Sequence, residues 1–177
     1  CYGKNHEVIE RVLPGRFADK EKDEMSYEKE KTYQKEFRPY LQLIEGLNIF
    51  LEKAHKTGIK MAIGSAAIMF NIDFVIDGLD IRNYFSSLIS ADNVTHSKPH
   101  PETFLKCAEA LGVKPNECIV FEDAPKGVEA AKNAGMRTIV ILNVHKKEEF
   151  TAYDNIIAFI ESYYDISLNS LLQAHIV

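Results

Sequence analysis

The sequence of 177 residues has no tryptophan and is poor in cysteine, with only three. Cys1, Cys107 and Cys118 have neither the spacing of a metal site nor that of a redox motif. An odd number of cysteines without a disulfide framework favours a reducing compartment. We therefore expect a cytoplasmic protein in which Cys107 and Cys118 are small core residues.

The sequence also lacks an excess of positive charge and a long apolar run. It has 21 Lys and Arg against 26 Asp and Glu, for a net charge of −5. Nucleic-acid binding depends on a basic surface, and a membrane-spanning helix needs about 20 apolar residues. We therefore expect neither nucleic acid nor a membrane as a partner, and a monomer or weak oligomer. The length suits one ordinary domain, or a core with a modest insert.

The residue pattern changes near Pro39-Tyr40. Residues 1–38 are predicted to be mostly helical, with mixed-sign charges on the surface and Met25, Tyr33 and Phe37 as an inner face. From residue 41 short apolar runs alternate with helical stripes, which predicts a parallel sheet with helices on both faces. The expected strands are residues 59–63, 87–90, 118–121, 138–142 and, at an edge, 156–160, followed by a closing helix at 167–173.

Two adjacent acids, Glu122 and Asp123, follow the apolar run 118–121. At the carboxyl end of a strand in an open parallel sheet, side chains face the ligand crevice. Neighbouring carboxylates repel each other unless a cation offsets them, and such oxygen ligands suit Mg2+. The alternative is that these acids only begin the next helix, where they would cap it and complement its dipole.

Two further positions follow earlier predicted strands. Gly64-Ser65-Ala66 ends the first of them, and a serine hydroxyl with neighbouring amides can cradle a phosphate there. Lys98 lies in a loop that contains two prolines, and its ammonium group can neutralise a phosphoryl oxygen. Each has a simpler interpretation, because Ser65 can cap a helix and an isolated lysine is normally on the surface.

The order of these positions resembles the haloacid dehalogenase superfamily, in its phosphatase and β-phosphoglucomutase-like branch. The resembling stretches are Gly64-Ser65-Ala66 and residues 97–104, 121–131 and 134–136. The resemblance covers most of residues 41–142. It implies an α/β fold, with a Rossmann-like parallel sheet, helices on both of its faces and a small helical cap domain. We expect the cap at residues 1–40 and the core at residues 41–177.

The resemblance also implies a role for each residue. Ser65 and Ala66 would bind the transferring phosphoryl group, and Lys98 would stabilise its charge and the nucleophile. Asp123 would bind Mg2+, with Glu122 as a direct or water-mediated ligand. In the cap, His6 and Lys29 lie roughly where mutase-type relatives place basic residues on the distal phosphate of the substrate. A solvated surface is the alternative interpretation of both.

The sequence departs from the family in one respect, because it contains no Asp-x-Asp. In the family the first Asp of this motif becomes an aspartyl-phosphate and the second is the general acid and base. Asp73, Asp77 and Asp80 are instead predicted on the solvated face of an amphipathic helix. The family's motif-bearing strand lies between the strands that lead to Ser65 and to Glu122. Without it, unpaired backbone groups would cost about 1–3 kcal/mol each, so we expect this chain to be part of a longer protein.

The function expected from the resemblance is Mg2+-dependent phosphoryl transfer through an aspartyl-phosphate. We favour hydrolysis of a small sugar or organic phosphate, so the expected partner is a small phosphorylated metabolite. A β-phosphoglucomutase-type sugar-phosphate mutase is the first alternative. A non-catalytic protein that binds phosphate or metal is the second, if the 177 residues are the whole protein. A receiver-type signalling domain fits less well, because its lysine follows the last strand.

Overall fold

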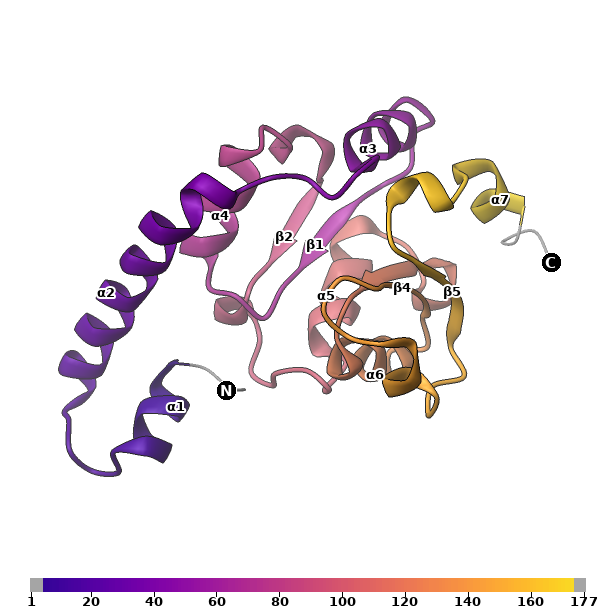
Figure 1. The fold of residues 1–177 in the computed structure, drawn as a ribbon. Helices are drawn as coiled ribbons and strands as arrows, with labels where there is room; N and C mark the ends of the chain where they lie inside the picture. Colours follow the sequence, from indigo (N-terminus) through magenta and orange to yellow (C-terminus); the bar gives the residue numbers. More distant parts are fainter. Residues whose placement is uncertain (1–4, 174–177) are drawn as a thin grey trace.

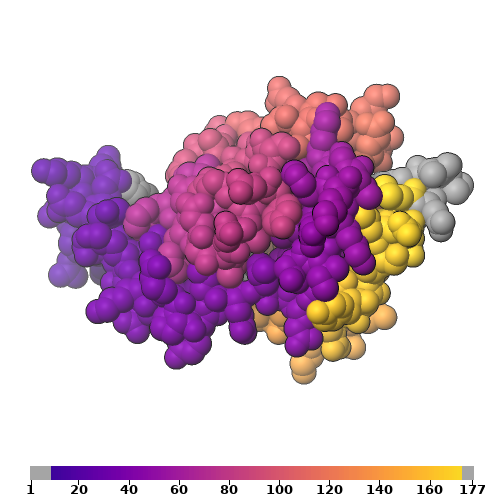
Figure 2. Space-filling view, turned by 90° about the horizontal axis from the view of Figure 1, so that it is seen from above, coloured from indigo at the N-terminus to yellow at the C-terminus, as the bar shows by residue number. Residues whose placement is uncertain are grey.

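The computed structural model of the protein describes residues 5–173 and begins with two helices (Figure 1). These are α1 (Asn5–Val12) and α2 (Asp19–Phe37), followed by a short 3-10 turn at Arg38–Tyr40. They project from one end of the molecule, opposite α7 (Leu168–Gln173) (Figure 2). The pattern change predicted near Pro39-Tyr40 therefore coincides with the end of this helical segment.

The inward side of α2 is polar, which corrects the prediction of an apolar inner face. Met25, Tyr33 and Phe37 are all exposed. The buried or half-buried positions of α2 instead include four polar residues at four-residue spacing, Lys22, Ser26, Glu30 and Gln34. Gln34 donates hydrogen bonds to the Phe70 carbonyl and to Asn71, and Asn71 donates to Glu30. Hydrophobicity alone could not find this face, because α2 meets α4 (Met69–Gly78) through these hydrogen bonds as well as through the contact between the Tyr27 and Phe70 rings.

Between residues 5 and 173, five short parallel strands confirm the predicted alternation of strand and helix. β1 (Ala62–Gly64) pairs with β2 (Ser87–Ile89), and β4 (Arg137–Ile141) lies between β3 (Ile119–Glu122) and β5 (Ile156–Ile160). All three pairings are parallel. The predicted edge strand is confirmed as β5.

These strands form two sheets, whereas the sequence predicts one. Within residues 5–173, no strand pairs with both β1 and β3, so the order β2-β1 is interrupted before β3-β4-β5. The interruption lies where the family places the strand that bears Asp-x-Asp. The sheet is divided because the described residues supply no strand between β1 and β3.

Helices cover both faces of the sheets, as predicted. α5 (Glu102–Leu111) packs on β1 and β2, and α6 (Pro125–Asn133) packs on β3 and β4. Val120 of β3 packs with residues of α5 and α6, whereas Phe121 contacts Phe50 of α3 (Leu47–Lys56) at 5.4 Å between ring centroids. Because successive side chains of a strand point to opposite faces, α3 lies on the face opposite α5 and α6.

Apolar packing joins the two sheets. Leu47 of α3 contacts the cluster around Ile72 and Ile76 and also the cluster around Ile139 and Ile160. On the other face, Phe104 of α5 packs with Val120 of β3. Burial of one such side chain stabilises a fold by about 1.5–3 kcal/mol. The helices therefore hold the sheets beside each other without hydrogen bonds between β1 and β3.

Cys107 and Cys118 are free thiols. Cys107 is buried on α5, as predicted, and Cys118 is only half-buried just before β3. Burial raises the pKa of the Cys107 thiol to about 11. None of the helices in residues 5–173 combines the length and the apolar character needed to cross a membrane.

Candidate active site

Four predicted site residues meet at the carboxyl ends of β1 and β3. Ser65 directly follows β1, Glu122 ends β3, and Asp123 comes next. Lys98 enters from the loop between β2 and α5. All four line one cavity of about 480 Å³. The structure thus brings together residues that lie up to 58 positions apart in the sequence.

Lys98 connects the ends of the two sheets. Its Nζ donates to the Gly64 carbonyl oxygen at 3.1 Å and lies 2.5 Å from Glu122 Oε1. The same ammonium group is 4.4 Å from the centre of the Phe104 ring, which attracts a cation. The side chains of Lys98 and Glu122 are only 13% and 10% exposed. Lys98 is therefore not the ordinary surface lysine of the alternative interpretation.

Glu122 is fixed on both of its carboxylate oxygens. Oε1 meets Lys98, while Oε2 accepts hydrogen bonds from the amides of Asp123 and Ala124 at 3.1 and 3.3 Å. The carboxylate also lies against the backbone of Gly127, where an added Cβ would come within 2.0 Å of Glu122 Cδ. Glu122 is therefore held so that it positions the Lys98 ammonium group.

Asp123 is the more exposed of the two acids. Its pKa is raised above the usual value, first because neighbouring atoms shield the carboxyl group from water and then because Glu122 is negative. The positive charges of His145 and Lys98 lower the pKa of Asp123 and so oppose this rise. A cation at this carboxylate would relieve the repulsion, and oxygen donors are what Mg2+ prefers. The residues present therefore fit Mg2+.

Ser65 and Ala66 form the turn that leaves β1. The Ser65 amide donates to the Ile89 carbonyl oxygen at 2.9 Å, and Ser65 Oγ accepts from the Ala67 amide at 3.1 Å. The hydroxyl hydrogen can therefore point toward a ligand. Gly64 allows α5 to approach this turn, because a Cβ there would lie 2.9 Å from Cys107 Sγ.

A second cavity, of about 1090 Å³, lies between α2, α4 and the Ser65 turn. Ser65 and Ala66 line both cavities. Lys29 lines the second one, and its Nζ is 2.6 Å from Glu30 Oε1. The structure therefore brings Lys29, but not Lys98, into this cavity with Ser65. His6 is in α1, but its side chain lies outside the described residues.

Sequence reasoning missed three polar groups in these cavities. Glu30 is 6% exposed and Asn71 lines the same cavity, but Glu30 stands in a run of charges typical of a surface. Asn143 lines the smaller cavity just after β4. Its place at the carboxyl end of a predicted strand was a usable signal.

The acids of α4 do not belong to either cavity. Arg82 pairs with Asp73 at 2.6 Å and with Asp77 at 2.5 Å, and the side chains of both acids are about half exposed, 45% and 57%. These acids lie on the solvated side of α4, as the amphipathic pattern predicts. They do not replace the Asp-x-Asp motif.

Comparison with known proteins agrees with this geometry. The chain is 43% identical over 79 residues to fructose-1-phosphate phosphatase YqaB of Escherichia coli, covering 45% of this chain and 42% of that protein. It is 36% identical over 99 residues to hexitol phosphatase B of the same organism, covering 56% and 45% of the two chains. The chain thus spans less than half the length of these two relatives.

The fold is also shared with a solved structure, β-phosphoglucomutase from Clostridium difficile. The two structures superpose with a TM-score of 0.81 at 24% identity, covering 97% of this chain and 77% of the mutase. The family model for haloacid dehalogenase-like hydrolases matches residues 5–141. Because this match extends over most of the sequence, the chain belongs to the family of haloacid dehalogenase-like hydrolases.

Proposed function

We propose that this chain is part of a Mg2+-dependent phosphatase that acts on a small sugar phosphate through an aspartyl-phosphate. The observation that carries the proposal is the position of Lys98. Its ammonium group is held between Gly64 and Glu122, in the cavity that Ser65 and Asp123 also line. Such preorganised charge is the main contribution of a protein to phosphoryl transfer.

The described residues have separate tasks in the proposed reaction. The Ser65 hydroxyl and the Ala66 amide orient the phosphoryl group. Lys98 stabilises the negative charge as the bond from phosphorus to the substrate oxygen breaks and an aspartate oxygen bonds to phosphorus. Glu122 keeps Lys98 in place. Water then attacks phosphorus, releases inorganic phosphate and restores the aspartate.

We assign Mg2+ binding to Asp123, with Glu122 as a second, water-mediated contact. The raised pKa of Asp123 and the oxygen-rich surroundings support this assignment. When bound, Mg2+ supplies positive charge that neutralises phosphate oxygens. Asn143 lines the same cavity and offers a further oxygen donor.

The nucleophile is proposed to come from a strand that pairs between β1 and β3. Both strands have an edge that no described strand occupies, and the two edges belong to the sheets that Lys98 connects. A strand with Asp-x-Asp at its carboxyl end would place both acids beside Ser65 and Lys98. The printed sequence has no such motif, so the longer protein would supply it.

Substrate selection is proposed to occur in the larger cavity beside α2. Its polar groups, Lys29, Glu30 and Asn71, can hydrogen-bond to the hydroxyls of a sugar. The names of the two Escherichia coli relatives support a phosphorylated sugar or sugar alcohol as the substrate class. We propose that residues 1–40 act as the cap, and that the protein is a cytoplasmic monomer or weak oligomer, in keeping with its free thiols.

The proposal is tested by measuring phosphate release by the full-length protein with and without Mg2+. Fructose 1-phosphate and hexitol phosphates are the first substrates to assay. We expect Asp123→Asn to lower the rate by more than about 100-fold, because the site loses charge that stabilises the transition state. Asp154→Asn is the matched control, since Asp154 is 82% exposed and pairs with Lys132 on the surface.

The control variant should keep the wild-type rate and the same Mg2+ requirement. If full-length wild-type protein releases no phosphate from any sugar phosphate, or if Asp123→Asn retains the full rate, the proposal is wrong. A folded Asp123→Asn protein, judged by circular dichroism, is required for the comparison.

A sugar-phosphate mutase is the second candidate. The observation that favours it is the position of Lys29, which lines the cavity with Ser65 where a second phosphate could bind. Product analysis separates the two candidates, because a phosphatase yields inorganic phosphate and a mutase yields an isomeric sugar phosphate.

A further inference from the structure

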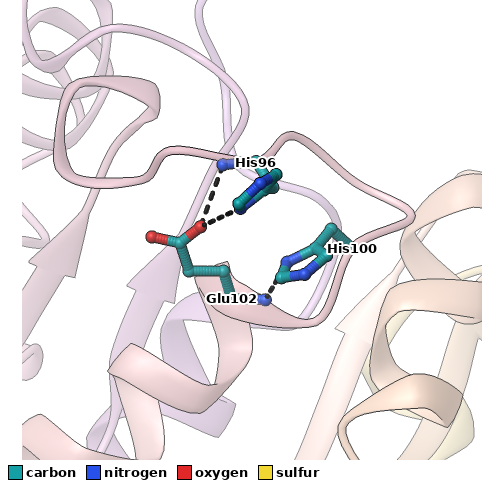
Figure 3. A group of neighbouring side chains, drawn as sticks. All are labelled: His96, His100 and Glu102. Carbon is teal, nitrogen blue, oxygen red and sulfur yellow. Dashed lines mark hydrogen bonds and ion pairs between the residues drawn. The ribbon is translucent and has the colours of Figure 1, made fainter.

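Three potential metal ligands gather on the loop that leads from β2 to α5. His96, His100 and Glu102 each offer one ligand atom, and these atoms lie within 4.8 Å of one another. Figure 3 shows the Glu102 carboxylate directed toward the His96 ring, with the His100 ring beside it. The centres of the two imidazole rings are 4.4 Å apart. None of the three residues lines the two cavities described above.

The Glu102 carboxylate is already fixed in place. It accepts hydrogen bonds from the amides of Thr95 at 3.0 Å and His96 at 2.9 Å, and Lys106 pairs with it at 3.1 Å. Lys106 meets Oε1, whereas the His96 ring meets Oε2 at 3.2 Å. Supporting contacts of this kind orient the ligands of metal sites. The lysine therefore leaves Oε2 directed at the histidines.

The two histidines need only small movements to complete a site. Two ligands of a tetrahedral Zn2+, at about 2.0–2.1 Å from the metal, lie about 3.3 Å apart. The separation of 3.2 Å between His96 Nδ1 and Glu102 Oε2 already matches this value. His96 is 62% exposed and His100 is also exposed, so solvent can reach both rings. His100 Nδ1 accepts a hydrogen bond from the Glu102 amide at 3.3 Å, which holds its ring beside the carboxylate.

The donor set selects a particular class of metal. Two imidazole nitrogens and one carboxylate oxygen suit Zn2+ and its neighbours, Ni2+ and Cu2+, whereas Mg2+ prefers oxygen ligands alone. Three protein ligands leave a fourth position for water. We propose that His96, His100 and Glu102 bind one Zn2+ ion, at a site separate from the Mg2+ site at Asp123.

This site would act on the loop that holds Lys98. In the sequence, Ser97, Lys98 and Pro99 lie between the ligands His96 and His100. The Lys98 side chain pairs with Glu122. A metal ion that joins His96 to His100 closes a short loop around Lys98. Bound Zn2+ therefore restricts the movement of the lysine on which the proposed phosphoryl transfer depends. The metal site itself does not rest on that activity.

The test is a calorimetric titration of the full-length protein with Zn2+, after treatment with a chelator. We expect one Zn2+ per chain, with an affinity that falls by about tenfold or more in His96→Asn and in His100→Asn. His55→Asn is the matched control, because His55 is exposed on α3, where its ring packs against the Tyr84 ring. It should retain the wild-type affinity.

Two further measurements locate the ion and report its geometry. Asp123→Asn should still bind Zn2+, which separates this site from the active-site cavity. Co2+ in place of Zn2+ should give strong visible absorption bands in wild type and weak ones in His96→Asn. The proposal is overturned if wild type binds no Zn2+, if both histidine variants bind it as well as wild type, or if Asp123→Asn abolishes binding.

Discussion

At the scale of single residues, Gly127 has a function that its position in a helix conceals. It belongs to the first turn of α6, where alanine normally stabilises a helix relative to glycine by about 1 kcal/mol. Here the Glu122 carboxylate occupies the space of a side chain, with Oε1 at 2.1 Å from the position of an added Cβ. Glycine therefore allows Glu122 to remain between α6 and Lys98.

We expect Gly127→Ala to destabilise the protein by about 1–3 kcal/mol, the usual cost of overpacking. The methyl group must displace Glu122, and Lys98 then loses its partner. Urea unfolding measures the change, with Lys132→Ala on the exposed side of the same helix as a control expected within about 1 kcal/mol, the most that a surface ion pair contributes. A more stable Gly127→Ala protein would show that helix propensity outweighs the contact with Glu122.

The sequence predicts that Ser65, Lys98, Glu122 and Asp123 lie together, because they follow predicted strands in the order typical of a known family. The structure brings the four into one cavity, and their roles stay predictions. Glu30 was not found, because nothing in a run of alternating charges indicates which carboxylate is buried. Its burial depends on Asn71, which is 41 residues away and belongs to another helix.

At the scale of elements, the start of α5 depends on a carboxylate that the helix itself supplies. Glu102 accepts hydrogen bonds from the amides of Thr95 and His96, and these lower its pKa from 4.5 to about 2. Lys106 and the His96 ring add to this effect. The group is thus ionised in the folded protein at pH values where the unfolded chain begins to bind a proton.

This lowered pKa gives a defined pH dependence. Glu102 stabilises the fold above about pH 4.5, and the contribution is lost as the pH falls from there toward about 2. We expect the difference in unfolding free energy between wild type and Glu102→Gln to be largest near neutral pH and to shrink across that window. Urea unfolding at a series of pH values measures it.

Glu109→Gln is the control for this experiment, because Glu109 is exposed on the same helix. It should change the free energy by less than about 0.5 kcal/mol at every pH. A constant difference between wild type and Glu102→Gln, independent of pH, would contradict the account of α5.

The sequence predicts helices and strands where apolar periodicity is strong. It does not always predict which face of an element is buried. Each expected strand is present. β5 has the predicted bounds, residues 156–160, whereas the other four strands have shifted ends, since strand ends depend on pairing partners that the sequence does not reveal. The prediction for the inner face of α2 was wrong for a different reason. Hydrophobicity assigns Met25, Tyr33 and Phe37 to the interior, but the polar side of α2 packs on α4.

At the scale of the whole molecule, the two sheets are joined by helices and by one ion pair. Phe104 lies near Gly64 of β1 and packs with Val120 of β3. Leu47 packs against the cluster of α4 and against that of β4 and β5, and Lys98 links the ends of β1 and β3. The alternating pattern alone could not predict two sheets, because it specifies the strands and helices but not which strands pair. The break between β1 and β3 lies where the resemblance places the strand that this sequence lacks. Neither β1 nor β3 has a strand on its outer edge within residues 5–173, and we propose that the missing strand pairs there.

The central claim is that the Lys98 ammonium group at this junction drives phosphoryl transfer. Loss of Lys98 alone would leave Glu122 buried and unpaired, at a cost of about 3–5 kcal/mol. The informative protein is therefore the double variant Lys98→Met with Glu122→Gln, which removes both charges together. Lys53→Met, on exposed α3 surface, is the matched control.

The measurement is the rate of Mg2+-dependent phosphate release from the best sugar phosphate, by full-length wild type and both variants. The account predicts a folded double variant with a rate lower by roughly 10²–10³-fold or more, and an unchanged rate for Lys53→Met. A folded double variant that keeps the wild-type rate would contradict it.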